Sequence, residues 1–80
     1  MIINIKAFGI AREIFGSTVV SISLPDTAVV ADLLPEIKRL YPAMNKLSSF
    51  AIAVNGCYAT NETALTAADE VAVIPPVSGG

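Results

Sequence analysis

Helical periodicity is sustained only once in this chain, and the apolar segments around it follow the shorter repeat of strands. Between residues 30 and 41 the large apolar residues recur at intervals of three and four, a spacing typical of an amphipathic helix with one buried face. Segments 2–8, 18–24, 50–54, 57–60 and 70–74 instead predict strands. Because one helix covers only one face of a sheet, this order predicts a two-layer α+β domain whose other sheet face is exposed.

The first two strands are expected to pair as a hairpin through a link with a short helical turn over 11–15, closed by Gly16. Alternation assigns the core-facing positions to Ile3, Ile5, Ala7, Val20, Ile22 and Leu24. Phe8 is the one large apolar residue on the otherwise polar face of the first strand. It is therefore a candidate for contact with another protein.

The helix is expected to bury Val30, Leu33, Leu34, Ile37, Leu40 and Tyr41. Pro42 marks its end, because the residue before a proline avoids the helical conformation. Pro35 is discordant, since a proline inside a helix removes a hydrogen bond and costs about 3 kcal/mol. We expect the helix to bend there; the alternative is a helix that starts later. A polar loop through Asn45 and Ser49 follows.

The second half of the chain carries a strong turn signal. Asn55-Gly56 favours a type I′ turn, so segment 57–60 is expected to return antiparallel to segment 50–54, and Leu65 to anchor the next connection. Pro75-Pro76 ends the last strand. Placing that strand beside the first gives a β-grasp topology, a mixed sheet of about five strands packed on one main helix.

Composition excludes several classes of function. The chain has 80 residues, a net charge of −2, no histidine and one cysteine, so it lacks the basic stripe of a nucleic-acid binder and the ligands of a typical zinc site. We expect no bound metal, no membrane segment and no signal peptide, and hence a cytoplasmic location. Cys57 has no histidine to activate it, and the favoured interpretation is a small packing residue in a strand.

No catalytic constellation is visible, because Asp69 and Glu70 are adjacent and point to opposite faces of a strand. The unusual feature is the carboxyl end. Pro75-Pro76 favours an extended approach, and Gly79-Gly80 has no Cβ to block entry into a narrow channel. We predict a domain over 1–76 and a flexible tail over 77–80 that presents the Gly80 carboxylate. A frayed terminus without function is the alternative.

These residues resemble a known family over essentially the full length. The closing block from Asp69 to Gly80 is the most specific part; Phe8-Gly9, Ala11-Arg12-Glu13, Gly16, Leu33-Leu34, Tyr41-Pro42 and Ala53-Val54-Asn55 also fit. The chain is similar to the small subunits of molybdopterin synthase, which are ubiquitin-like sulfur-carrier proteins with a β-grasp fold. Pro35 and Ala67-Ala68 depart from the pattern of that family and put only local geometry in doubt.

The resemblance implies a specific cycle. A ubiquitin-activating-like adenylyltransferase would use ATP to adenylate Gly80, and a sulfur donor protein would convert it to a thiocarboxylate. The tail of Pro76, Val77, Ser78 and Gly79 would then enter the large synthase subunit and deliver sulfur to cyclic pyranopterin monophosphate (precursor Z), which becomes molybdopterin. The small subunit binds no cofactor, holds no catalytic side chains of its own, and joins a heterotetramer in this family.

The expected docking surface combines Phe8, Tyr58, Ile74 and Pro75. The alternative for each side chain is ordinary partial burial, and Arg12 is as consistent with a solvated turn as with pairing to a partner carboxylate. Three other functions stay open: a sulfur carrier of the thiazole pathway, a ubiquitin-like modifier joined to lysines through Gly80, and an interaction domain without a reactive end.

Overall fold

The computed structural model describes residues 1–47 and 49–75. Along the chain the elements are β1 (Ile2–Ala7), α1 (Gly9–Phe15), β2 (Val19–Ser23), α2 (Val30–Leu40), a 3-10 helix η1 (Pro42–Lys46), β3 (Ala51–Val54), β4 (Cys57–Tyr58) and β5 (Val71–Ile74). The five strands form one sheet in the order β2-β1-β5-β3-β4. The predicted strands and main helix are therefore confirmed, with shorter bounds.

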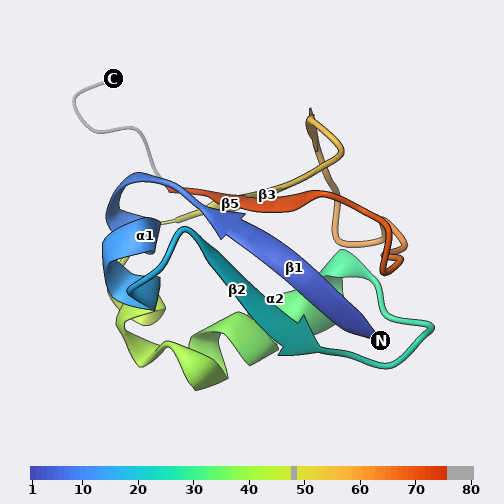
Figure 1. Ribbon diagram of the computed structural model, residues 1–80, viewed down its shortest axis with the longest axis horizontal. Coiled ribbons are helices and arrows are strands. Elements are labelled where there is room, and N and C mark those ends of the chain that lie inside the picture. The colour runs from blue at the N-terminus through green and yellow to red at the C-terminus, as the bar shows by residue number, and fades with distance from the viewer. Residues whose placement is uncertain (48, 76–80) are drawn as a thin grey trace.

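The last strand occupies the centre of the sheet and lies beside the first (Figure 1). β5 pairs with β1 in parallel, Ile5 opposite Val71 and Ala7 opposite Val73, whereas every other pairing is antiparallel. A mixed sheet with this order is the β-grasp arrangement. The predicted fold class is thus confirmed, including the placement of the C-terminal strand beside β1.

One face of the sheet and the apolar face of α2 enclose the core. All six inward positions predicted for the first two strands face this side, although Val20 is only partly buried. From the other layer, Leu33 and Ile37 of α2 are fully buried, and Leu65 anchors the connection as predicted. Burying each such side chain contributes about 1.5–3 kcal/mol against the entropy of the ordered chain.

The ends of α2 follow from its sequence. The backbone N–H of Val29 donates to Oδ2 of Asp32 at 2.9 Å, which satisfies one of the amides left open at a helix start. The helix begins at Val30 and continues through Pro35, so a start beyond this proline is excluded; the expected bend stays a prediction. Leu40 was wrongly assigned to the apolar face, because the helix ends there and leaves it 43% exposed.

Residues 42–46 are more ordered than the predicted polar loop. They form η1, whose Met44 is only 1% exposed and extends the core beyond α2. Tyr41, between the two helices, places its ring 4.4 Å from that of Phe15 in α1, with the ring planes tilted by 33°. Aromatic pairs at this separation add about 0.5–1.5 kcal/mol beyond the area they bury.

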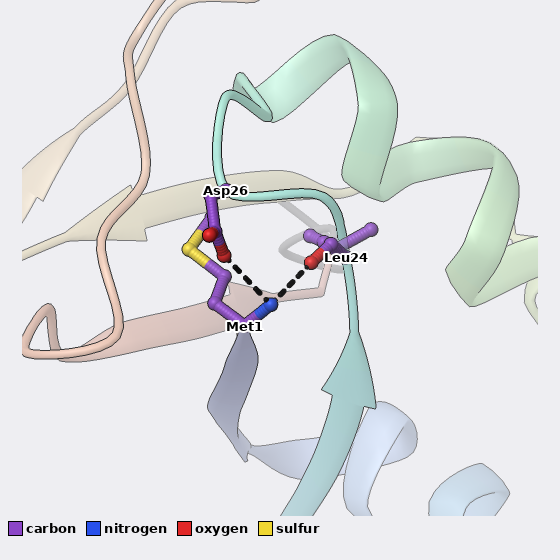
Figure 2. A network of polar contacts seen from close by, with 3 residues as sticks. All are labelled: Met1, Leu24 and Asp26. Atoms are coloured by element: carbon purple, nitrogen blue, oxygen red, sulfur yellow. Dashed lines mark hydrogen bonds and ion pairs between the residues drawn. The ribbon is translucent and has the colours of Figure 1, made fainter.

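The open end of the β1–β2 hairpin is closed by the chain's first residue (Figure 2). The amino group of Met1 donates to the carbonyl oxygen of Leu24 at 2.6 Å and to Oδ1 of Asp26 at 3.1 Å. These contacts hold the start of β1 against the segment that leaves β2.

Candidate functional site

The outer face of the sheet, turned away from α2, carries the candidate site. Asn4 and Lys6 of β1 and Ala72 and Ile74 of β5 occupy its alternate positions, because a strand sends successive side chains to opposite faces. Phe8 follows β1 and continues this series. It is 49% exposed, although it is a large apolar side chain.

A row of small residues forms a depression in this face. Ala72 lies opposite Ala53 in the β5–β3 pairing, and Ala53 lies opposite Tyr58 in the β3–β4 pairing. The result is a hollow of about 320 Å³, which we call the outer hollow, lined by Phe8, Ala53, Gly56, Tyr58, Glu70, Ala72 and Ile74. Methyl groups and a glycine leave room that larger side chains in the same row would fill.

The structure brings three sequence-predicted residues to this hollow. Phe8, Tyr58 and Ile74 come from three different parts of the chain and all line it. Tyr58 is 75% exposed and Ile74 half-buried, so ordinary burial in the core does not account for them. Exposed apolar patches mark interaction sites, and aromatic side chains are enriched among the residues that contribute most to protein binding.

Arg12 lies on the other side of Phe8. It lines a second hollow of about 300 Å³, the basic hollow, together with Lys6, Ala7, Phe8, Gly9, Thr18 and Val19. Phe8 is therefore shared between an apolar and a basic depression. A partner that covers both would need an apolar group for the first and gains from a carboxylate at the second.

Pro75 packs where α1 begins. A Cβ built on Gly9 would lie 3.3 Å from Cγ of Pro75, and Gly9 has a φ of +54°. Both the close approach and the backbone angle favour glycine at this position. Pro75 is thus held beside Phe8-Gly9 at the end of β5, next to Phe8 and Ile74 of the predicted docking surface.

The rim of the outer hollow is charged. Nζ of Lys6 lies 2.8 Å from Oε1 of Glu70, and this hydrogen bond and the positive charge hold the pKa of Glu70 below its usual value. Sequence reasoning missed this pair, because 64 positions separate the two residues. The feature that could have revealed the pair is the parallel pairing of β1 and β5, because it places Lys6 near the start of β5.

A second polar cluster holds the β3–β4 turn against the start of β5. Nδ2 of Asn55 donates to Oδ1 of Asp69 at 3.0 Å, and the backbone N–H of Glu70 donates to Oδ1 of Asn55 at 2.9 Å. The pKa of Asp69 is lowered, chiefly by the hydrogen bond from Asn55 and then by the backbone N–H of Thr66. This cluster positions Glu70 at the rim of the outer hollow.

The turn itself is as predicted. Asn55 has a φ of 53° and Gly56 a φ of 84°, the pair of positive values that a type I′ turn requires. Cys57, directly after it, is exposed. The prediction of a packed cysteine was therefore wrong: β4 lies at the edge of the sheet and both of its residues are exposed.

The predicted site residues Pro76, Val77, Ser78, Gly79 and Gly80 lie outside the described residues, and the division between a domain over 1–76 and a tail over 77–80 stays a prediction. Within residues 1–47 and 49–75, no three His, Cys, Asp or Glu side chains gather as a metal site would need. In that same part of the chain no helix combines the length and apolarity needed to cross a membrane.

Comparison with known proteins decides the family. A model of the ThiS family matches residues 5–80, nearly the entire chain. The chain belongs to the ThiS family. The match extends from β1 to the carboxyl end and so includes both hollows, and it agrees with the sulfur-carrier resemblance inferred from the closing sequence motif.

Relatives of this ThiS-family chain span it completely. The molybdopterin synthase sulfur carrier subunit of Chlamydomonas reinhardtii is 36% identical over 83 residues, covering 100% of both chains. Among solved structures, SAMP1 from Haloferax volcanii superposes with a TM-score of 0.84 at 29% identity over 100% of both chains. A subunit in the complex of subunits 1 and 2 of the molybdopterin-converting factor from Helicobacter pylori gives 0.68 at 25% identity, also over 100% of both.

Proposed function

We propose that this protein is the sulfur carrier of molybdopterin synthase. In this cycle the Gly80 carboxylate is adenylated with ATP by a ubiquitin-activating-like adenylyltransferase and becomes a thiocarboxylate with sulfur from a donor protein. The tail with its Gly80 thiocarboxylate enters the large synthase subunit in the cytoplasm and transfers sulfur to cyclic pyranopterin monophosphate. Two thiocarboxylated carriers supply the two sulfur atoms of each molybdopterin.

The observation that carries this proposal is the position of the outer hollow beside the end of β5. Ile74 lines the hollow and Pro75 packs on Gly9 next to it, and the chain continues from there to Gly80 through five residues. A partner seated on Phe8, Tyr58 and Ile74 is therefore within reach of the carboxyl end, since five extended residues span about 17 Å.

The proposal places catalysis in the partner chains and the reactive terminus in the carrier, and this division fits the described side chains. The outer hollow offers methyl groups, aromatic rings and the carboxylate of Glu70, none of which activates another carboxylate. The carrier therefore supplies a reactive terminus and a docking surface, while the partners supply catalysis. The curated relative's name and the Helicobacter pylori complex support the large synthase subunit as the docking partner.

A direct test is the mass of the C-terminal fragment 71–80 after cleavage at Glu70, from protein expressed with its activating enzyme. Replacing oxygen by sulfur adds about 16 Da, close to the gain from oxidising one methionine. This fragment contains neither Met nor Cys, so its gain in mass reports only on the carboxyl end. A gain that requires ATP and a sulfur source supports the proposal; an unshifted fragment with an active enzyme contradicts it.

The likeness to SAMP1, small archaeal modifier protein 1, supports a second function: conjugation of Gly80 to lysines of other proteins. An immunoblot of source cells distinguishes the two functions. A ladder of heavier species that disappears when Gly80 is deleted supports a modifier, and a single band supports a dedicated carrier. The thiazole-pathway carrier is the third candidate, tested by thiamine dependence of a deletion strain.

A further inference from the structure

The β3–β4 turn combines a reactive sequence with an unusual set of contacts. Asn55 is followed by glycine, whereas the other asparagines of the chain precede Ile, Lys and Glu. A backbone nitrogen attacks the side-chain amide of a preceding asparagine most readily when no side chain hinders it, and only Gly56 meets that condition. Asn55 and Gly56 are also exposed, so water and base reach them.

We propose that Asn55 is a site of spontaneous deamidation whose rate is controlled by its hydrogen bonds to the start of β5. The nitrogen of Gly56 bonds to Cγ of Asn55 and loses its proton, the Cγ–Nδ2 bond breaks, and ammonia leaves. Water then opens the cyclic imide to aspartate or isoaspartate. Nothing is oxidised or reduced, and water is the only co-reactant.

Three hydrogen bonds oppose the attack. The side chain of Asn55 donates to Asp69 at 3.0 Å and accepts from the N–H of Glu70 at 2.9 Å, and its backbone N–H donates to the carbonyl oxygen of Glu70 at 2.8 Å. Both polar atoms of the amide are thus held toward β5. Cγ reaches the nitrogen of Gly56 only when these bonds open, so the reaction follows local opening of the turn.

The product disturbs the contact that protected the asparagine. Aspartate at position 55 loses the N–H donor and places a second carboxylate against that of Asp69, where two like charges disfavour each other. Isoaspartate adds a backbone atom to a two-residue turn and shifts Gly56, which lines the outer hollow. The expected loss of docking rests on the proposed function; the chemistry at Asn55 does not.

The test uses the full-length chain at mildly alkaline pH, with fragments 47–62 analysed by tandem mass spectrometry over time. Deamidation adds about 1 Da as NH₂ becomes OH. Asp69→Ala removes the acceptor of the Asn55 amide and should speed deamidation about tenfold or more, the effect of losing one hydrogen bond to a charged group. Glu70→Ala is the matched control, because Asn55 contacts only the backbone of residue 70; its rate should equal that of the wild type.

A second comparison needs no variant. The wild-type chain unfolded in guanidinium should deamidate at Asn55 at least about tenfold faster than the folded chain, because local opening is then complete. Equal rates in folded and unfolded chains would overturn the proposal, and so would equal rates for Asp69→Ala and the wild type. Neither readout involves a partner or Gly80, so failure here is distinct from failure of the sulfur-carrier function.

Discussion

Lys6 and Glu70 form an ion pair, 2.8 Å between Nζ and Oε1, that links β1 to the start of β5 on the exposed face of the sheet. Both side chains are largely exposed, so solvent screens the pair and its effect on stability is small. Its position is more informative. Glu70 lines the outer hollow and Lys6 the basic hollow, so the pair separates the two depressions that a partner would contact.

The ion pair predicts a dependence of stability on acid pH. The pKa of Glu70 is lowered in the folded state by Lys6, so its contribution is present above the unfolded value of about 4.3 and is lost as pH falls through the folded pKa. Glu70→Gln should lower Tm slightly at neutral pH, by about 2 °C or less. Thermal unfolding across pH checks this: the gap should close in acid, and one that persists at the lowest pH contradicts it.

Phe8 predicts a separation of binding from stability. Phe8→Ala should weaken binding to the large synthase subunit about tenfold, as loss of a central aromatic contact does, while costing only about 1 kcal/mol of folding free energy because the ring is half-exposed. Ile2→Ala is the matched control: Ile2 is 53% exposed on the same strand face and lies outside both hollows. Calorimetric titration and denaturation measure the two effects; equal binding by both variants would argue against the docking site.

The carboxyl end also predicts a loss of function without a loss of stability. Removal of Gly79 and Gly80 should abolish thiocarboxylate formation completely and leave Tm unchanged, because the core that residues 1–47 and 49–75 form runs from Ile3 to Val73, ahead of the deleted positions. The mass of the C-terminal fragment and a melting curve give the two results. A large fall in Tm would mean that the last two residues support the fold.

Pro35 predicts a gain in stability. It lies within α2 and is exposed, so its replacement by alanine restores a backbone hydrogen bond without disturbing the core. The gain should be about 2 kcal/mol, the helix-interior penalty of proline less its restriction of the unfolded chain. Urea denaturation measures it, with Ala31→Gly on the same helix as a control that should destabilise. No gain would indicate that the helix has adapted to the proline.

The fold was largely predictable from the sequence because the spacing of apolar residues and the turn-forming residues indicate the same strands and helix. Alternation located β1 and β2, the three-four spacing located α2, and Asn55-Gly56 located the hairpin. Prediction was wrong where tertiary contacts outweigh local pattern. Met44 is in a segment whose composition indicates a loop, yet it completes the core beyond α2.

The candidate site was only partly predictable. Phe8 was recognisable as an apolar side chain on a polar face, and the place of Ile74 followed from the β-grasp order. The floor of small residues depends on the register that sets Ala72 against Ala53 and Ala53 against Tyr58, which no local pattern reveals. The same holds for Lys6 with Glu70 and for Asn55 with Asp69, whose pairings are set by long-range strand order.

The central place of β5 has a consequence for the protein's synthesis. Among the described residues β5 is the last strand along the sequence, and it lies between β1 and β3, so it joins the two halves of the sheet. Such non-local pairing is completed late, so a nascent or truncated chain that ends before residue 71 cannot close the sheet. A fragment of this kind leaves β1 and β3 without the strand that lies between them.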